Sequence, residues 1–119
     1  MANTWFITGA TRGLGKAIAQ AALAAGHNVV ATGRDKTGVE AALGSSDRLL
    51  ALALDVTQPA QANAAAEAAV QRFGAIDVLV NNAGYGLVGA LEEYSDAELV
   101  SQFNTNVFGV AYVTRAVLP

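Results

Sequence analysis

A glycine-rich segment near the start of the chain is the strongest indication of chemistry. It is residues 8–15, TGATRGLG, and it lies between an apolar run at residues 4–7 and an Ala-rich stretch. A glycine-rich turn that leads into a helix presents backbone N–H groups and the positive end of the helix to an anion. Gly9, Gly13 and Gly15 therefore indicate a site for the diphosphate of a dinucleotide.

The spacing of these glycines leaves an alternative open. It is G-x-x-x-G-x-G, whereas the usual dinucleotide fingerprint is G-x-G-x-x-G. An ordinary strand-to-helix turn also retains glycine for positive φ and close packing. The context of the segment must decide between the two interpretations.

A second polar turn, NNAG, follows a later apolar run. Asn81, Asn82, Ala83 and Gly84 come directly after residues 76–80, IDVLV. A run this apolar is typical of a strand that is covered on both faces of a parallel sheet. The second turn therefore ends a strand, as the first one does.

Short β-rich runs alternate with helical patterns along the whole chain. We expect strands near residues 3–8, 28–33, 48–54 and 76–81. Right-handed crossovers between them predict an α/β fold, a Rossmann-like doubly wound parallel sheet with strand order 3-2-1-4. The two polar turns would then face each other across the crevice between strands 1 and 4.

Three helices are predicted between these strands. The first covers about residues 13–25 and ends at Gly26, with Leu14, Ile18, Ala21 and Ala25 on one stripe. A weaker helix covers about residues 36–43. The third begins after Thr57, has Pro59 in its first turn and ends at Gly74.

A fourth helix is predicted from Ser95, which forms a capping box with Glu98, to Leu118. One helical stripe would contain Leu99, Phe103, Asn106, Val110, Val113 and Val117. On that stripe the Asn106 amide would enter a buried surface, where an unpaired polar group costs about 1–3 kcal/mol. Asn106 is thus either functional or satisfied by neighbouring backbone.

Composition narrows the classes of function. The 119 residues are 53% hydrophobic and 14% charged, which indicates one domain, residues 1–119. A net charge of -3 without a basic run argues against nucleic acid or an anionic membrane as partner. The absence of Cys and the single His27 exclude thiolate and His-rich metal sites. No basic leader or run of roughly 18 apolar residues occurs, so we expect a cytoplasmic protein.

Four motifs together resemble the short-chain dehydrogenase/reductase family. They are TGATRGLG, the pair Asp55-Val56 after the third strand, NNAG, and Asn106 within NVFG. The resemblance runs over all the residues, and the stretch YGLVGALEEYSDAE is similar to the 17β-hydroxysteroid-dehydrogenase-like branch. The resemblance implies a dinucleotide-binding Rossmann domain that is incomplete relative to the family.

The resemblance also implies roles for individual residues. The residues implied to hold the phosphates and the adenosine ribose are Gly9, Thr11, Arg12, Gly13, Leu14 and Gly15. Those implied to flank the adenine are Asp55 and Val56, and those implied to line the floor beneath the ribose are Asn82, Ala83 and Gly84. Asn81 would tie its turn to neighbouring elements. Asp55 has a second interpretation, as a carboxylate that caps the third helix.

The end of the second strand bears on the choice of cofactor. An acidic residue about 20 positions beyond the glycines would bind an unmodified ribose 2′-hydroxyl, but Gly33 occupies that place. Arg34 and Arg12 together would bind a 2′-phosphate, which favours NADP(H) over NAD(H). Alternatively Arg34 is a solvated charge neutralised by Asp35, which leaves room for NAD(H).

The family chemistry is hydride transfer between a nicotinamide and a small carbonyl or alcohol substrate. Asn106 matches the family's catalytic Asn, which positions a water beside Ser, Tyr and Lys. The Tyr-x-x-x-Lys motif does not occur, because Tyr85, Tyr94 and Tyr112 are followed four residues later by Gly, Glu and Ala. The chain stops about halfway through the family pattern, so it is expected to be inactive by itself.

Two functions of different class follow. The first is the amino-terminal cofactor-binding part of an NADP(H)-dependent short-chain dehydrogenase/reductase. The second is a non-catalytic nucleotide-binding or scaffold module, natural or engineered, without the Ser-Tyr-Lys residues. In either case the strand at residues 76–81 becomes an edge, and we expect self-association through this strand or the fourth helix.

Overall fold

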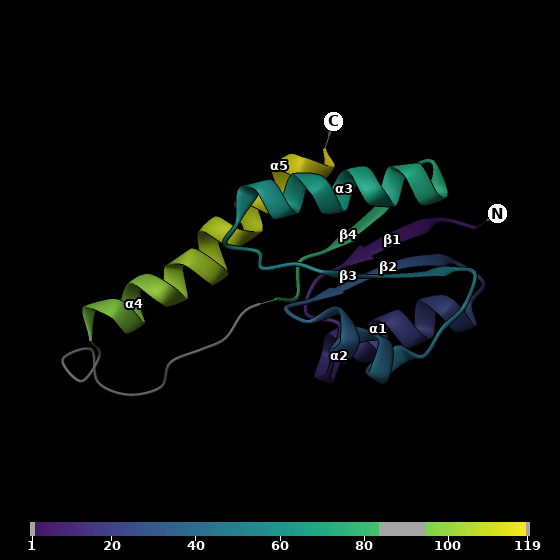
Figure 1. Ribbon diagram of the computed structural model, residues 1–119, viewed down its shortest axis with the longest axis horizontal. Coiled ribbons are helices and arrows are strands. Elements are labelled where there is room, and N and C mark those ends of the chain that lie inside the picture. Colours follow the sequence, from purple (N-terminus) through teal and green to yellow (C-terminus); the bar gives the residue numbers. More distant parts are fainter. Residues whose placement is uncertain (1, 84–94, 119) are drawn as a thin grey trace.

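A four-stranded parallel sheet forms the centre of the computed structural model, which describes residues 2–83 and 95–118. Its strands are β1 (Thr4–Ile7), β2 (Asn28–Gly33), β3 (Leu49–Ala53) and β4 (Val78–Val80). They lie in the order β3-β2-β1-β4 (Figure 1). The predicted Rossmann-like fold and strand order 3-2-1-4 are therefore confirmed.

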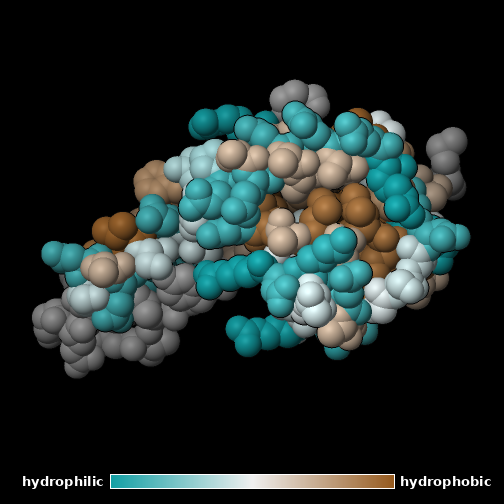
Figure 2. Space-filling model, viewed as in Figure 1, coloured by the Kyte–Doolittle hydropathy of each residue, from teal (hydrophilic) through white to brown (hydrophobic). Residues whose placement is uncertain are grey.

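Helices cover both faces of this sheet (Figure 1). The helices on one face are α1 (Gly13–Ala24) and α2 (Lys36–Leu43), and those on the other are α3 (Pro59–Phe73) and α5 (Val110–Val117). A further helix, α4 (Asp96–Phe103), projects beyond the sheet. The space-filling view shows apolar side chains, in brown, between the two helical layers (Figure 2).

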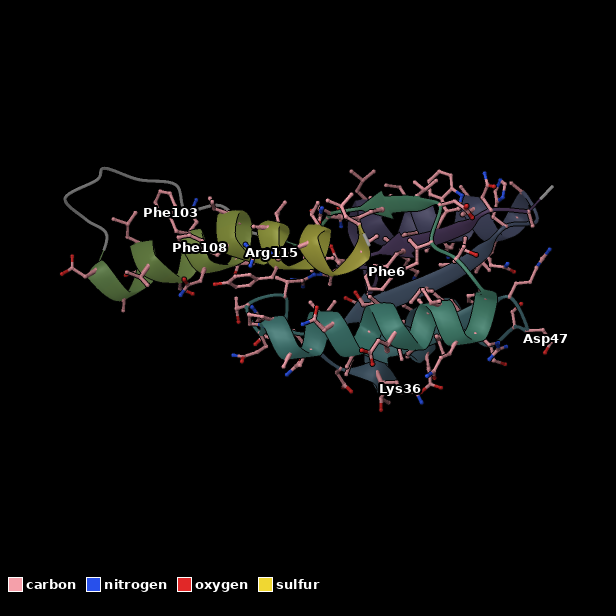
Figure 3. The ribbon with its side chains drawn as sticks, turned by 90° about the horizontal axis from the view of Figure 1, so that it is seen from above. Phe6, Lys36, Asp47, Phe103, Phe108 and Arg115 are labelled. Carbon is pink, nitrogen blue, oxygen red and sulfur yellow. The ribbon has the colours of Figure 1, made fainter. Side chains whose placement is uncertain are left out.

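Alternate side chains of the strands enter two separate cores. Ile7 packs with Ala19 of α1 and Val39 of α2, whereas Phe6 packs with α3 and with Val113 of α5 (Figure 3). This is the two-sided burial that parallel strands require. Strand β4 departs from it, because its three residues are only half-buried. The expectation that this strand is covered on both faces is thus met only in part, since β4 has a neighbour on one side alone in the described sheet.

The helix ends lie where the sequence places them. Gly26 after α1 and Gly74 after α3 have φ values of 90° and 89°, a conformation that favours glycine. Pro59 is the first residue of α3. At the start of α4 the Glu98 N–H donates to Ser95 Oγ (3.0 Å) and the Ser95 N–H donates to Glu98 Oε1 (3.4 Å). The predicted capping box is therefore present.

The predicted buried stripe of α1 is wrong. Leu14 is 67% exposed, and the buried positions are Gly15, Ala19 and Ala22. Small residues let the helix axis approach the sheet closely, so the size of the side chains decides the buried face here more than their hydrophobicity does. The Leu14 side chain is consequently left outside the core.

The predicted fourth helix is also not a single α-helix. A π-helical segment, η2 (Asn104–Gly109), separates α4 from α5. Because a π-turn bonds residue i to i+5, the 3.6-residue period does not continue across it. Phe103 is consequently 51% exposed while Val113 is 1% exposed, and the single stripe from Leu99 to Val117 is wrong. Asn106 lies inside η2 and is half-buried.

Candidate dinucleotide-binding site

A cavity of about 910 Å³ opens at the carboxyl ends of the strands. The turn after β1, the end of β2, the segment after β3 and the turn after β4 all contribute to it. Its lining residues are Gly9, Thr11, Arg12, Gly13, Thr32, Gly33, Arg34, Asp35, Leu54, Asp55, Val56, Asn82, Ala83, Ser101 and Thr105. Its volume falls in the range typical of cofactor sites.

Most of the predicted binding residues line this cavity. They are Gly9, Thr11, Arg12, Gly13, Arg34, Asp55, Val56, Asn82 and Ala83. Leu14, Gly15 and Asn106 are not among its lining residues, and Gly84 lies outside the described part of the chain. Most of the residues on which the prediction depends are thus brought together by the fold.

The glycine-rich turn has the properties that an anionic ligand needs. Gly9 and Gly13 have φ values of 64° and 59°, and a Cβ on Gly13 would meet no atom within 4 Å. Helix α1 has no acidic residue in its first turn, and Arg12, which precedes it, makes no side-chain capping bond. Its first N–H groups and its positive end therefore suit the diphosphate of a dinucleotide.

Gly15 has a different reason to be glycine. A Cβ at this position would lie 2.1 Å from the Gly9 carbonyl oxygen and 2.6 Å from Asn82 Nδ2. Asn82 Nδ2 itself donates to the Gly9 carbonyl oxygen (3.1 Å). Gly15 is thus required for packing inside the turn, which is the close-packing alternative that the sequence left open for these glycines.

Thr8 joins the two polar turns and was missed at the level of sequence. The backbone N–H groups of Asn82 and Ala83 both donate to Thr8 Oγ1, at 2.9 and 3.0 Å. Thr8 Oγ1 in turn donates to the Val80 carbonyl (3.4 Å). The signal that could have revealed it is a hydroxyl residue directly after a buried strand, opposite a second polar turn.

The end of β2 places a guanidinium group at the rim of the cavity. Arg34 is exposed and lines the cavity. The carboxylate of the next residue, Asp35, caps α2 by accepting from the Thr37 N–H (3.0 Å). The Asp35 carboxylate therefore has a local function of its own. The pKa of the nearby Asp55 is lowered mainly by its hydrogen bonds with Thr57, and the Arg34 charge adds to that lowering.

Asp55 holds the segment that follows β3. Its Oδ1 accepts from Thr57 Oγ1 (2.6 Å) and from the Thr57 N–H (3.0 Å). The Thr57 hydroxyl bond is the main cause that lowers the pKa of Asp55 below its ordinary value of 3.8. Helix α3 begins only at Pro59, with Gln58 at its N-cap position, so the interpretation of Asp55 as the capping carboxylate of this helix is wrong.

Val56 connects the cavity with the π-helical segment. Val56 is 7% exposed, and a Cβ on Gly109 of η2 would lie 2.7 Å from Val56 Cγ2. Thr105 of η2 and Ser101 of α4 also line the cavity. The sequence prediction missed these two residues, although polar residues four positions apart on a helix are a detectable signal.

Asn81 and Asn82 have separate functions. Asn81 Nδ2 donates to Thr114 Oγ1 of α5 (3.1 Å), whereas Asn82 bonds to the glycine-rich turn. The predicted role of Asn81 in tying the turn to its neighbours is therefore confirmed. Two further lining residues that the sequence prediction did not assign to the site are Thr32 of β2 and Leu54 directly after β3, and both are buried.

Comparison with known proteins gives consistent matches over the whole chain. A family model described as short chain dehydrogenase matches residues 3–119. The chain is 42% identical to Oxidoreductase BOA17 of Botryotinia fuckeliana over 121 aligned residues, 100% of this chain and 44% of that protein.

Solved structures agree with this match. The 3-ketoacyl-(acyl-carrier-protein) reductase from Brucella melitensis complexed with NADH has a TM-score of 0.93 and 39% identity, over 98% of this chain and 49% of that one. The alcohol dehydrogenase from Thermococcus sibiricus complexed with 5-hydroxy-NADP has a TM-score of 0.91 and 30% identity, over 99% and 52%.

The chain spans about half the length of these proteins. Among the residues described by the structure, no helix is long and apolar enough to cross a membrane.

Proposed function

Because this chain belongs to the short chain dehydrogenase family, we propose that it is the amino-terminal, cofactor-binding part of an NADP(H)-dependent oxidoreductase. The whole enzyme would transfer hydride to or from a small carbonyl or alcohol substrate. The observation that carries this proposal is the cavity of about 910 Å³, which brings together Gly9, Gly13, Arg34, Asp55 and Asn82 from four strand ends.

Different groups of cavity residues fit different parts of a dinucleotide. The glycine-rich turn and the start of α1 would hold the diphosphate, and Asp55 with Val56 would flank the adenine. Asn82 and Ala83 would form the floor beneath the ribose, with Gly84 continuing it. Leu14 and Gly15 are adjacent to this contact surface through the first turn of α1. A bound nicotinamide cofactor supplies the hydride chemistry.

We favour NADP(H) over NAD(H) because of the charge at the end of β2. The last residue of β2 is Gly33 and not an acidic residue, whereas Arg34 is exposed at the cavity and Arg12 lines it. Asp35 also lines the cavity, but its carboxylate accepts from the Thr37 N–H and caps α2. Guanidinium groups bind phosphate through charge-assisted hydrogen bonds. The relatives with bound nucleotides include one with NADH and one with 5-hydroxy-NADP, so the preference depends on this chain's own residues.

Asn106 is proposed as the catalytic Asn of the whole enzyme. It lies within η2, between Thr105, which lines the cavity, and Gly109, which packs against Val56. Single π-helical turns often occur at functional sites, because they reorient a side chain inside a helix. Its proposed function is to position a water for proton transfer.

The second candidate is a non-catalytic nucleotide-binding or scaffold module. It is favoured for the 119 residues alone, because none of the three tyrosines begins a Tyr-x-x-x-Lys motif. The proposals are separated by whether the reading frame continues past Pro119 into a strand with Ser and a helix with Tyr-x-x-x-Lys. Continuation supports the enzyme, and a stop codon supports the module.

Binding is tested by titrating the purified protein with NADPH and NADH and following nucleotide fluorescence, with carbonyl reduction assayed in parallel. We expect saturable binding that is tighter for NADPH, and no turnover by the 119 residues alone. Absence of binding by natively folded protein would contradict the cofactor site. Turnover would contradict the assignment of the proton donor to residues outside this stretch.

Three further predictions accompany this function. Self-association is proposed through β4, an edge strand of the described sheet, or through α4 and η2, which carry exposed apolar side chains. Location in the cytoplasm and membership of the 17β-hydroxysteroid-dehydrogenase-like branch stay predictions. Most of the stretch that suggested this branch lies outside the described residues.

A further inference from the structure

The end of β2 is packed too tightly to accept a side chain at position 33. A Cβ on Gly33 would lie 2.7 Å from Thr11 Cγ2 and 3.0 Å from Val39 Cγ2. Gly33 is not one of the glycines with positive φ, so its backbone conformation suits any residue. Space alone therefore requires glycine here, and the Thr11 methyl group is the nearest obstacle.

The surrounding backbone leaves little freedom to relieve this contact. The Ala10 N–H donates to the Thr32 carbonyl (3.0 Å), which ties the glycine-rich turn to β2. The Leu54 N–H donates to the Gly33 carbonyl (2.7 Å), which ties β2 to the segment after β3. Val39 is 0% exposed. Neither Gly33 nor Val39 can shift without disturbing the sheet or the core, so the Thr11 side chain is the element that must change.

We propose that Thr11 is a specificity-determining residue, because its methyl group occupies the space that an acidic side chain at position 33 would need. The inference rests on the proposed dinucleotide site. A carboxylate at the end of β2 is the usual acceptor for an unmodified ribose 2′-hydroxyl. Because Thr11 keeps position 33 a glycine, the last residue of β2 provides no such acceptor. The nearby Asp35 carboxylate caps α2, so the exposed Arg34 cation dominates recognition of the 2′ position. Thr11 and residue 33 therefore act as a coupled pair.

The binding test compares Gly33→Asp with the double variant Thr11→Ser/Gly33→Asp, using Thr11→Ser as the reference for the double. Thr11→Ser removes only the methyl group and keeps the hydroxyl. We expect Gly33→Asp to lower NADPH affinity at least tenfold, roughly, without gaining NADH affinity. The double variant is expected to bind NADH about tenfold or more tightly than Gly33→Asp does. Equal NADH affinity of the single and double variants would overturn the proposal.

A stability test measures the steric coupling without any nucleotide. Gly33→Ala adds only the Cβ, and we expect it to lower the thermal midpoint by roughly 5–10 °C through overpacking. Thr11→Ser should recover at least about half of that loss in the double variant. Gly38→Ala is the matched control, because its Cβ would lie 3.7 Å from the same Thr11 Cγ2, an ordinary contact. A loss for Gly33→Ala that Thr11→Ser does not reduce, or an equal loss for Gly38→Ala, would contradict the coupling.

The two tests fail in distinguishable ways. If the unmodified protein binds neither nucleotide, the proposed function fails, and the thermal measurements still decide whether Thr11 excludes a side chain at position 33. If the unmodified protein binds NADPH but the double variant gains no NADH affinity, the specificity role of Thr11 is refuted while the cofactor site stands. Should Gly33→Asp not fold, recovery of folding by Thr11→Ser supports the coupling and its absence contradicts it.

Discussion

Thr8 and Asn82 prepare the site through hydrogen bonds to backbone groups. Thr8 Oγ1 accepts from two N–H groups of the turn after β4, and Asn82 Nδ2 donates to the Gly9 carbonyl. Each bond joins residues more than 70 positions apart in the sequence. The shape of the glycine-rich turn is therefore set by a second strand end before any ligand binds.

Arg34→Ala is expected to weaken NADPH binding about tenfold or more and to change NADH binding much less. The reason is that only NADPH carries the 2′-phosphate that a guanidinium group at this position would pair with. The measurement is a fluorescence titration with each nucleotide. Arg72→Ala is the control, because it removes the same charge from the end of α3, where Arg72 donates to the Asp47 carbonyl. Equal losses for NADPH and NADH would discredit the 2′-phosphate assignment.

Asp55 makes the stability of the protein depend on pH. Its pKa is lowered in the folded state, mainly by the Thr57 hydroxyl, so its stabilising contribution is present above the ordinary value of 3.8. That contribution is lost as the pH falls through the folded pKa. Near neutral pH, thermal unfolding should give Asp55→Asn a lower free energy of unfolding than the unmodified protein. The difference should be about 1 kcal/mol or less, because Asp55 is only half-buried.

The difference between Asp55→Asn and the unmodified protein should shrink at acid pH, where both carry an uncharged side chain. Asp47→Asn is the control, since Asp47 is exposed and uses its backbone carbonyl to accept from Arg72. A difference that stays constant down to about pH 2 would contradict the assignment to the ionised carboxylate.

Small residues decide how α1 meets the rest of the protein. The buried positions of this helix are Gly15, Ala19 and Ala22, and Gly15 lies against the Gly9 carbonyl. In the second half of the chain Gly109 similarly lets η2 approach Val56. Both helical segments carry small residues where they contact the rest of the protein. These small residues allow α1 and η2 to lie at the edge of the cavity.

Gly15→Ala and Gly13→Ala should differ strongly although both lie in the same turn. The Gly15 Cβ would lie 2.1 Å from the Gly9 oxygen, so we expect a loss of about 3 kcal/mol or more. The Gly13 Cβ would face open space, and only its positive φ costs about 1–2 kcal/mol. Denaturant unfolding measures both. Because Gly15 has no positive φ, a loss for Gly15→Ala that is no larger than the loss for Gly13→Ala would contradict the packing argument.

At the scale of the whole molecule, α4 and η2 carry apolar side chains that are exposed in the part of the chain that the structure describes. Val100, Phe103, Val107 and Phe108 of α4 and η2 are between 47% and 57% exposed. Phe103 and Phe108 both belong to this projecting part (Figure 3), which carries apolar side chains on its surface in the space-filling view (Figure 2). Exposed apolar side chains that gather on one part of a molecule are typical of an interaction site.

Phe103→Asp is expected to weaken self-association at least tenfold, roughly, because it places a charge among these apolar side chains. Sedimentation velocity at micromolar concentration measures the change. Val70→Asp, at an apolar position of α3 that is 46% exposed, is the control and should leave association unchanged. A monomeric unmodified protein would contradict self-association. Unchanged association of Phe103→Asp would instead favour the β4 edge as the contact surface.

Local patterns in the sequence determined much of this protein. The glycine-rich turn, the ends of α1 and α3, the Ser95 capping box and the strand order follow from short-range periodicity, turn chemistry and the handedness of crossovers. For the same reason most of the predicted binding residues reach one cavity, because the carboxyl ends of parallel strands share an edge.

Only the tertiary structure decided the remaining features. The sequence did not reveal which face of α1 is buried, the π-helical segment, the role of Thr8 or the contact between Thr11 and Gly33. Each depends on which atoms lie within a few ångströms of one another after packing. Hydrophobic periodicity reports which residues prefer burial, but the distance at which two backbones meet is set by the smallest side chains between them.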